Sequence, residues 1–450
     1  MANLLVRNVE IHHPRFIGFR KMAGLGPNPD NPAIHALRRK GMLGVYYDFN
    51  RGGQDFIVKG RLDDLSDTRL VPSLSRDSAV QAFVDGPVLQ RAHNVLTETP
   101  QLIARARYYN TDKIDFDNLS FGLTPTDAMF FAEIKANGQW PAAASLVPFG
   151  NIPISPAAGV LNYGQGLFEG MKAYRTENGG IALFRPLDNA RRAQNGAKRL
   201  GLTPVQEEIF LDAVERVVLA NERFIPPYGK GALYIRPLLI GSGGIMGVAP
   251  APENTFIVFA TPVGPYFKGG LTGISLKISD EHHRAPAGGI GNVKGIGNYA
   301  PGMVPAQEAK ALGFAELIYL DAQKHTYLEE AGAANIFVVM NGELYTPALS
   351  GTILPGITRD SVIELAKARG YRVHDKQRLS RELLASAEAV FVTGTAAVIA
   401  PVTSITDRGN KIIFNDGRIH PIVSDLHLEL TGIQEGRIAD PFGWVHALKA

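Results

Sequence analysis

From about residue 112 onward, segments with the pattern of β-strands alternate with segments that have helical periodicity. Residues 255–263, 274–279 and 316–322 are rich in β-branched and aromatic residues, which is typical of strands. Residues 206–222 and 358–369 carry apolar side chains at helical spacing. This alternation limits the chain to folds in which helices and sheets share one core.

Local signals refine that prediction. Asn341-Gly342 lies between two β-rich arms and predicts a hairpin with a type I′ turn. Thr358 is a candidate N-cap for the second helix, and Gly370 is placed to end it. Residues 389–396 predict a strand that runs into a Gly-Thr turn. Because hairpins accompany the alternation, we predict a mixed α/β (α+β) fold and not a purely parallel doubly wound sheet.

The length of 450 residues suggests two domains or three, and 45% hydrophobic residues can form a sizeable core. We predict that residues 1–110 form an N-terminal extension of unknown role. Residues 111–262 are expected to form a small α/β domain. Residues 263–275, rich in glycine and proline, are expected to connect it to a large domain at 276–450.

Composition excludes several classes of protein. The net charge is only +3 and no long run of Lys and Arg occurs, which argues against a nucleic-acid binder. The absence of cysteine excludes disulfides, thiol catalysis and Cys-ligated metals. His12 and His13 have no third ligand in view, so no metal site is predicted. No run of about 18 apolar residues predicts a membrane span.

The first residues lack an apolar stretch long enough for a signal peptide. Acidic residues within 1–110 also argue against a mitochondrial or plastid transit peptide. From these two features we expect a cytoplasmic protein.

Lys294 is surrounded by glycines at 288, 289, 291, 295 and 297. Glycines allow the backbone to approach a ligand closely. A P-loop is excluded because Val293 precedes this lysine and Gly295 follows it. A desolvated lysine amine suits carbonyl and Schiff-base chemistry, whereas an exposed lysine in a flexible loop is the alternative.

Two segments have the features of phosphate sites. In LPGITRDS the free N–H groups of Ile357 and Thr358 stand at a predicted helix start, where the helix dipole attracts anions. TGTA at 393–396 places small residues and a hydroxyl after a strand. An ordinary helix start and a simple turn are the alternatives.

Glu330 is a candidate buried carboxylate. If YLEEAGAANIF is extended, Glu329 and Glu330 point to opposite faces, so one can be buried and the other solvated. A buried carboxylate needs a cationic partner, and a protonated pyridine nitrogen would serve.

From about Asp112 to the C-terminus the chain resembles the branched-chain aminotransferases of the fold-type IV pyridoxal phosphate class. The resemblance rests on LNYGQGLFEGMKAYR, FRPLDNARR, LYIRPLLIGSGG, VKGIGNY, LEEAGAANIF, ILPGITRDS and VTGTAAVIAPV, all in the family's order. It covers about three quarters of the chain. It implies two mixed α/β domains with the active site between them, the larger one binding the cofactor.

The resemblance implies roles for particular residues. Lys294 would hold pyridoxal 5'-phosphate as a Schiff base, and Tyr299 would donate to the cofactor's phenolic oxygen. Glu330 would pair with the pyridinium nitrogen and keep the ring an electron sink. The phosphate would be bound by Arg192, the backbone of Ile357 and Thr358, and Thr395.

On the substrate side, the resemblance implies an apolar pocket and two carboxylate sites. Arg236 would meet the second carboxylate of glutamate, and the N–H groups of Thr395 and Ala396 would hold the α-carboxylate. The pocket would be lined by Tyr163, Phe168 and Tyr234. Family members are homodimers whose pocket borrows residues from the neighbour, and Tyr163, Met246 and Val248 match those positions.

The chain departs from the family pattern around the predicted cofactor site. The family often has a larger or polar residue where Ala333 and Ala334 stand, and Pro301 follows the NYA segment. The contacts of Tyr299 are therefore expected to differ from those of other members.

The implied activity is reversible transfer of the amino group of leucine, isoleucine or valine to 2-oxoglutarate, with the freed Lys294 amine as general base. Alternatives that keep the cofactor are a D-amino-acid aminotransferase, an aminodeoxychorismate-lyase-like enzyme and an aminotransferase of specialised metabolism. The first two are less favoured because YIRPLLIG and GTAAVIAPV match the branched-chain pattern. A binding or regulatory protein on the same scaffold is a further alternative, against which the joint presence of the cofactor-site residues argues. The expected partners are small-molecule amino acids and 2-oxo acids.

Overall fold

The computed structural model describes residues 114–135, 145–267 and 270–448, together with the backbone of three short strands before them. These strands are β1 (Glu10–Ile11), β2 (Tyr47–Arg51) and β3 (Gln54–Lys59), in the order β1-β3-β2. The rest of the predicted extension, with His12 and His13, lies outside the described residues.

The chain divides into two compact units. One comprises Met1–Lys113, Pro125–Phe131 and Ala144–Ile154, and the other comprises Ile114–Thr124, Ala132–Ala143 and Ser155–Ala450. Strand β5 (Ser145–Pro148) pairs antiparallel with β4 (Ala128–Ile134). Every residue predicted for the active site belongs to the second unit. The predicted division at 111–262, 263–275 and 276–450 remains a prediction.

The first sheet of the second unit has the strand order β21-β8-β7-β9-β10, and β6 also pairs with β9. All of these pairings are antiparallel. The strands are β6 (Gly166–Phe168), β7 (Met171–Arg175), β8 (Ile181–Phe184), β9 (Ala232–Gly241), β10 (Asn254–Val263) and β21 (Val445–Leu448).

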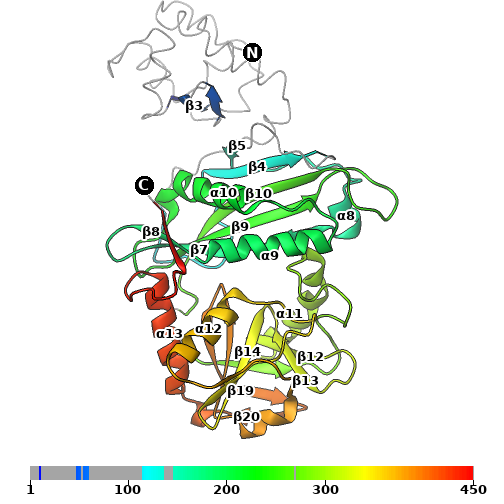
Figure 1. Cartoon of the computed structure of the whole chain (residues 1–450), viewed down its shortest axis with the longest axis vertical. Helices are drawn as coiled ribbons and strands as arrows, with labels where there is room; N and C mark the ends of the chain where they lie inside the picture. Colours follow the sequence, from blue (N-terminus) through cyan, green and yellow to red (C-terminus); the bar gives the residue numbers. More distant parts are fainter. Residues whose placement is uncertain are drawn as a thin grey trace, which may run out of the picture. The chain divides into compact units, whose positions relative to one another are not determined.

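Helices α9 (Pro186–Arg199) and α10 (Glu207–Ala220) lie along this sheet (Figure 1). The apolar stripe of α10 is buried, and Phe210 packs against Phe256 of β10 with ring centroids 5.8 Å apart. The predicted helix at 206–222 and the predicted strand at 255–263 are confirmed. Burial of one face, and not local propensity alone, holds this helix in place.

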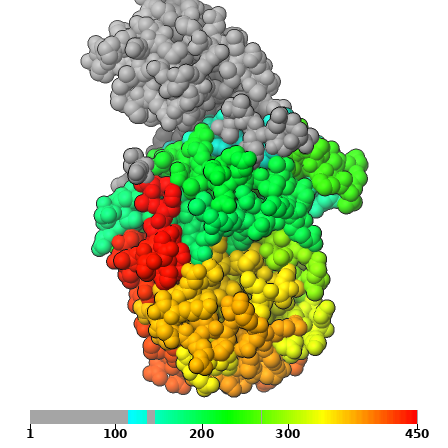
Figure 2. All heavy atoms as spheres, viewed as in Figure 1, coloured from blue at the N-terminus to red at the C-terminus, as the bar shows by residue number. Residues whose placement is uncertain are grey.

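The chain returns to the first sheet at its end. β21 pairs antiparallel with β8, and Trp444 packs edge-on against Phe184 at 5.7 Å. Figure 2 shows this segment in red, on the surface beside residues drawn in green.

The second sheet contains parallel and antiparallel pairs. Its order is β16-β15-β14-β18-β19-β11-β12-β13-β17, with β20 on β19. An additional pairing of β13 with β14 closes the strands from β14 through β13 into a ring. The strands are β11 (Ile274–Ile278), β12 (Glu316–Leu320), β13 (Tyr327–Ala331), β14 (Ala334–Met340), β15 (Glu343–Tyr345), β16 (Val373–His374), β17 (Leu379–Ser380), β18 (Ala389–Gly394), β19 (Val398–Asp407) and β20 (Asn410–Ile413).

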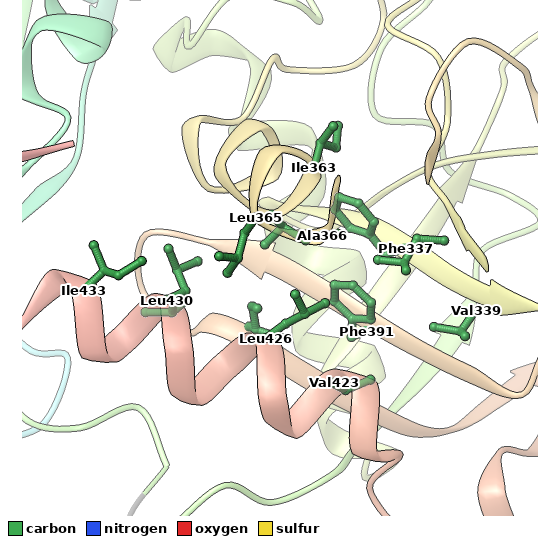
Figure 3. Packing of buried hydrophobic residues seen from close by; sticks show 14 of the residues in the cluster. Phe337, Val339, Ile363, Leu365, Ala366, Phe391, Val423, Leu426, Leu430 and Ile433 are labelled. Atoms are coloured by element: carbon green, nitrogen blue, oxygen red, sulfur yellow. The ribbon is translucent and has the colours of Figure 1, made fainter. Parts of the chain in front are cut away.

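Alternate residues of the ring strands belong to two separate cores. Ile336 and Val338 of β14 join one apolar cluster formed by the strands themselves. Phe337 joins the other cluster, where it stacks on Phe391 of β18 at 4.8 Å. Helices α12 (Ile357–Ala368) and α13 (Pro421–Gln434) cover this second cluster (Figure 3). Because successive strand residues point to opposite faces, continuous apolar runs are required here.

The local predictions for this region are largely confirmed. Asn341 and Gly342 have φ of 51° and 69°, as a type I′ turn requires. The helix predicted at 358–369 is α12, and Gly370 follows it at a φ of 84°. The N-cap prediction is wrong: Gly356 is the N-cap, and Thr358 lies inside the first turn.

The second unit also contains two shorter α-helices, α8 (Gly159–Tyr163) and α11 (Met303–Ala311). No helix in the described part of the chain is long and apolar enough to cross a membrane.

Leu426→Ala tests the core under α13. Leu426 is fully buried in the cluster with Phe391. Its truncation is expected to lower the free energy of unfolding by about 2–5 kcal/mol, through lost burial and a cavity. Leu428→Ala on the same helix is the control, because Leu428 is 58% exposed and its loss should cost about 0.5 kcal/mol or less. Equal denaturation midpoints for the two variants would contradict this packing.

Candidate active site

Lys294 lies in the glycine-rich segment between β11 and α11, and this segment is tied to the first sheet. The N–H of Phe168 donates to the carbonyl of Lys294 at 3.1 Å, and Leu167 forms a β-bridge with Gly295. The amine Nζ lies 3.4 Å from the hydroxyl of Tyr299 and 4.8 Å from the centre of the Phe168 ring. The structure therefore brings Lys294, Tyr299 and Phe168 together, as predicted.

Burial lowers the pKa of Lys294 to about 8, and the positive charge of Arg192 acts in the same direction. An ammonium loses solvation energy in such surroundings, so the neutral amine is favoured. A neutral amine is the form that attacks a carbonyl carbon.

Glu330 is placed by strand register. Glu330 of β13 pairs with Asn335 of β14, and Asn335 pairs with Thr393 of β18. The Asn335 amide donates to Glu330 Oε1 at 3.2 Å, and the N–H of Leu354 donates to Oε2 at 3.0 Å. These contacts align a carboxylate, an amide and a hydroxyl across three neighbouring strands.

Arg284 is a partner of Glu330 that the sequence reasoning missed. Its guanidinium forms an ion pair with Glu330 Oε2 at 2.8 Å and donates to the carbonyls of Gly291 and Thr352. Burial nevertheless raises the pKa of Glu330 to about 7, against the opposing effects of Arg284 and the Leu354 N–H. No sequence signal singles out Arg284, because it belongs to none of the motifs.

Glu329 and Glu330 do occupy different surroundings, but both are buried. Thr352 donates to Glu329 Oε1 at 2.5 Å, and burial raises the pKa of this carboxyl. Neither glutamate is the solvated member of the pair, because both faces of the strand ring are covered.

Arg192 of α9 points to the start of α12. It donates through Nη1 to the carbonyl of Pro355 at 3.0 Å. Its other edge forms a two-point ion pair with Glu169, at 2.8 and 2.6 Å. Glu169 is fully buried and also accepts from Asn189 at 2.8 Å. Sequence reasoning missed Glu169, although it belongs to the quoted segment LFEG.

Three residues of the predicted phosphate site meet in space. Ile357, Thr358 and Thr395 line one cavity of about 20 Å³. Gly356 caps α12 without a side-chain hydrogen bond, which leaves N–H groups of the first turn available. Any side chain at Gly356 would collide with Asn335 Oδ1, so glycine is required at this approach.

Arg236 lies over the aromatic residues predicted for the substrate pocket. Its guanidinium is 4.6 Å from the centre of the Phe168 ring, and Nη2 donates to the Tyr234 hydroxyl at 3.3 Å. Its Nε is buried, with no hydrogen-bond partner among the residues that the structure describes. Phe121, also missed from sequence, packs edge-on against Tyr234 at 5.0 Å.

The three residues predicted to be borrowed by a neighbouring subunit form a separate group. The Tyr163 hydroxyl donates to the carbonyl of Met246 at 2.5 Å. Tyr163 is 41% exposed, Met246 86% and Val248 89%. The structure holds them at the surface and gives them no role beside Lys294 of the same chain.

Two of the residues that depart from the family pattern line one cavity. Pro301 and Ala333 border a space of about 250 Å³, together with Tyr299, Arg284 and Tyr319. The small residues on this side of Tyr299 leave its ring partly uncovered.

The residues present fit pyridoxal phosphate. An amine of lowered pKa, a buried carboxyl and a helix start with available N–H groups surround one region. Thr393 Oγ1, which is beside Asn335 in register, is buried and has no hydrogen-bond partner in the described part of the chain. A buried polar atom without a partner is costly, and a ligand would relieve that cost.

The sequence pattern of the amino-transferase class IV family matches residues 166–405. This is more than half of the chain, so the protein belongs to that class of pyridoxal phosphate-dependent aminotransferases. Branched-chain amino acid aminotransferase 2, chloroplastic, of Humulus lupulus is 50% identical over 331 residues, which are 74% of this chain and 81% of the relative. The chain therefore belongs to the branched-chain aminotransferase family, and that prediction is confirmed.

Two solved structures carry the same fold. The branched-chain aminotransferase of Escherichia coli is 30% identical, with a TM-score of 0.61 over 71% of this chain and 98% of that one. The T.th. branched-chain aminotransferase complexed with N-(5'-phosphopyridoxyl)-L-glutamate is 31% identical, with a TM-score of 0.59 over 71% and 98%. The predicted fold-type IV, mixed α/β class is confirmed.

Two further relatives are informative. A mitochondrial branched-chain aminotransferase of Humulus lupulus is 45% identical over 74% of this chain and 84% of its own length. A methionine aminotransferase of Arabidopsis thaliana is 42% identical over 77% and 96%. The prediction of a cytoplasmic protein is contradicted, because several of the branched-chain relatives are chloroplastic or mitochondrial by name. Acidic residues in the first 110 positions were a poor argument against organellar targeting.

The pKa of Lys294 generates a prediction for the cofactor-free protein. Labelling of Lys294 with limiting acetic anhydride should show a midpoint near pH 8, because burial and Arg192 both favour the neutral amine. Arg192→Met should move this midpoint to higher pH, because it removes the positive charge that helps to lower the pKa of Lys294. Exposed Lys376 is the internal reference, read by mass spectrometry of the same digest. A midpoint near the ordinary value of 10.5 would contradict the buried setting of the amine.

Proposed function

We propose that this protein transfers the amino group of leucine, isoleucine or valine to 2-oxoglutarate, using pyridoxal 5'-phosphate. One observation carries the proposal: the Lys294 amine lies beside Phe168 and Tyr299 and has a lowered pKa. Such an amine attaches a carbonyl group and then exchanges a proton near neutral pH.

The cofactor would be held at four points. Lys294 would attach it, Tyr299 would donate to its phenolic oxygen and Glu330 would pair with its ring nitrogen. Arg192, the N–H groups of Ile357 and Thr358, and Thr395 would bind its phosphate. The positive end of α12 and the fixed Arg192 guanidinium both favour a dianion at this position.

Bound pyridoxal phosphate supplies an electron sink for the charge that develops at the substrate α-carbon. The protein supplies the proton transfer: Lys294 Nζ takes the α-proton of the amino acid and returns a proton in the second half of the reaction. The Phe168 ring, 4.8 Å from Nζ, excludes water on that side. A pKa of about 8 suits an amine that must both accept and release a proton.

The substrate pocket combines apolar and cationic groups. Phe168, Tyr234 and Phe121 would pack on the aliphatic side chain, at about 0.8 kcal/mol per methylene group buried. Such packing discriminates weakly between apolar amino acids. Methionine is therefore a second candidate substrate, favoured by the Arabidopsis relative named for it. Arg236 would bind the distal carboxylate of glutamate and 2-oxoglutarate, and Thr395 and Ala396 the α-carboxylate.

The exposed group of Tyr163, Met246 and Val248 favours a homodimer in which each pocket is completed by the partner subunit. Side chains that are 86% and 89% exposed and apolar are suited to burial in an interface. The domain division at 263–275 is part of the same proposal, since it places the pocket between a small and a large domain.

Borohydride reduction tests the attachment residue. The purified protein with added pyridoxal phosphate should become permanently modified at Lys294, as located by peptide mapping. Lys294→Ala should lose transamination of leucine by about 10²-fold or more, since general acid–base catalysis alone contributes that much. A colourless protein that shows no transamination activity after addition of pyridoxal phosphate would contradict the proposal.

Arg236→Met tests the distal carboxylate site. kcat/KM for 2-oxoglutarate should fall by about 10- to 100-fold, because one charge-assisted contact is lost. kcat/KM for 4-methyl-2-oxopentanoate, which has no second carboxylate, should change much less. Equal losses for both oxo acids would show that Arg236 acts elsewhere.

A further inference from the structure

The turn after β18 is attached to the first sheet by two hydrogen bonds. This turn, residues 395–397, connects β18 to β19, and Gly394 pairs with Val398 across it. Thr395 Oγ1 donates to the carbonyl of Gly170 at 3.2 Å, and Lys172 Nζ donates to the carbonyl of Ala396 at 2.7 Å. Gly170 directly precedes β7, and Lys172 belongs to this strand.

Lys172 reaches the turn from inside the molecule. It is only 8% exposed, and it pairs in register with Tyr234 of β9, so the two side chains share one face of the sheet. It lines the same small cavity as Thr358 and Thr395. Lys172 therefore stands between the proposed phosphate site and the proposed substrate pocket.

The ammonium of Lys172 has few partners for its charge. Within the described residues it forms no ion pair, and its one hydrogen bond leaves two of three donors available. Burial lowers its pKa to about 8, with the distant charge of Glu435 opposing this shift. A buried cation kept without a carboxylate is costly, which favours a functional reason for its position.

The turn itself is strained at its far end. Val398 has a φ of 59°, a conformation that β-branched residues rarely adopt, and it is buried. Strain of this kind persists only where surrounding contacts impose the conformation. The Lys172–Ala396 bond is one of those contacts, two residues before Val398.

We propose that Lys172 is a positioning residue, which by its hydrogen bond to the Ala396 carbonyl fixes the 395–397 turn in the conformation that presents its N–H groups to the substrate α-carboxylate. This inference rests on the proposed function, because it assigns the carboxylate to that turn. Holding the Ala396 carbonyl toward β7 turns it away from the anion. The positive charge adds attraction for the carboxylate through the same peptide group.

The consequence differs from that of losing Arg236. Every amino acid and 2-oxo acid substrate has an α-carboxylate, whereas only glutamate and 2-oxoglutarate have a distal one. Loss of the Lys172 side chain should therefore weaken the binding of leucine and of 2-oxoglutarate to a similar extent.

The test compares Lys172→Met with Lys172→Arg in the cofactor-loaded protein. Binding of 4-methylvaleric acid, a carboxylic acid without an amino group, is measured by calorimetry. Lys172→Met should weaken it by about 10-fold or more, as expected for a lost charge-assisted contact. KM for both leucine and 2-oxoglutarate should rise more than kcat falls. Lys172→Arg should retain affinity within about threefold, since a donor and a charge remain.

Exposed Lys376→Met is the matched control and should behave as the wild type. The unfolding temperature of the cofactor-free variants is recorded so that a folding defect is recognised. If Lys172→Met does not fold, Lys172→Gln replaces it. Its shorter, uncharged side chain should also weaken the binding of 4-methylvaleric acid.

The two proposals fail in different ways. A wild-type protein that binds no cofactor and transfers no amino group overturns the proposed function. An active wild type, with a folded Lys172→Met variant that binds 4-methylvaleric acid within about twofold of it, overturns the role of Lys172 alone. So does a variant in which only the affinity for 2-oxoglutarate falls.

Discussion

The site depends on two carboxylates that are buried together with arginines. Glu169 is fully buried and holds Arg192 by two bonds, and Glu330 is 2% exposed and pairs with Arg284 at 2.8 Å. Removing a charge from water costs several kcal/mol unless it is paired and hydrogen-bonded. Each pair therefore fixes the direction of its arginine or carboxylate, and neither side chain can rotate away without leaving a buried charge alone. The side chains of these two pairs are therefore held in place before any ligand arrives.

These pairs also explain how two sheets make one site. Glu169 follows β6 of the first sheet, while the carbonyl that Arg192 meets precedes α12. Glu330 lies on β13 of the second sheet, and its partner Arg284 holds the glycine-rich segment through Gly291. Lys294 is attached to β6 through the N–H of Phe168. The amine is thus held from both sheets, which accounts for its burial and for the lowered pKa that follows from it.

Sequence patterns predicted the parts of this structure that depend on residues close together in the sequence. The Asn341-Gly342 turn and α12 follow from turn chemistry and helical periodicity, and both are present. Glu169, Arg284 and Phe121 were missed, because each gains its meaning from a partner distant in the sequence. The Thr358 cap prediction failed because Gly356 is the N-cap, and the side chain of Asn335 on β14 leaves room only for glycine there. The order of the motifs along the chain indicated the family, which no single motif could do.

Among the described residues, burial lowers the pKa of two lysines, Lys172 and Lys294, to about 8. Acidity therefore does not decide which of them attaches a carbonyl group. Geometry does: Lys172 Nζ is bound at 2.7 Å to a carbonyl that fixes a turn, so using it as a nucleophile would release that turn. Among the described residues, Lys294 Nζ has one hydrogen-bond contact, a long one to Tyr299, and two aromatic rings lie beside it. Lys294 Nζ, which gives up the weaker contact, is therefore suited to covalent chemistry. Lys172 Nζ is suited to holding the binding site in place.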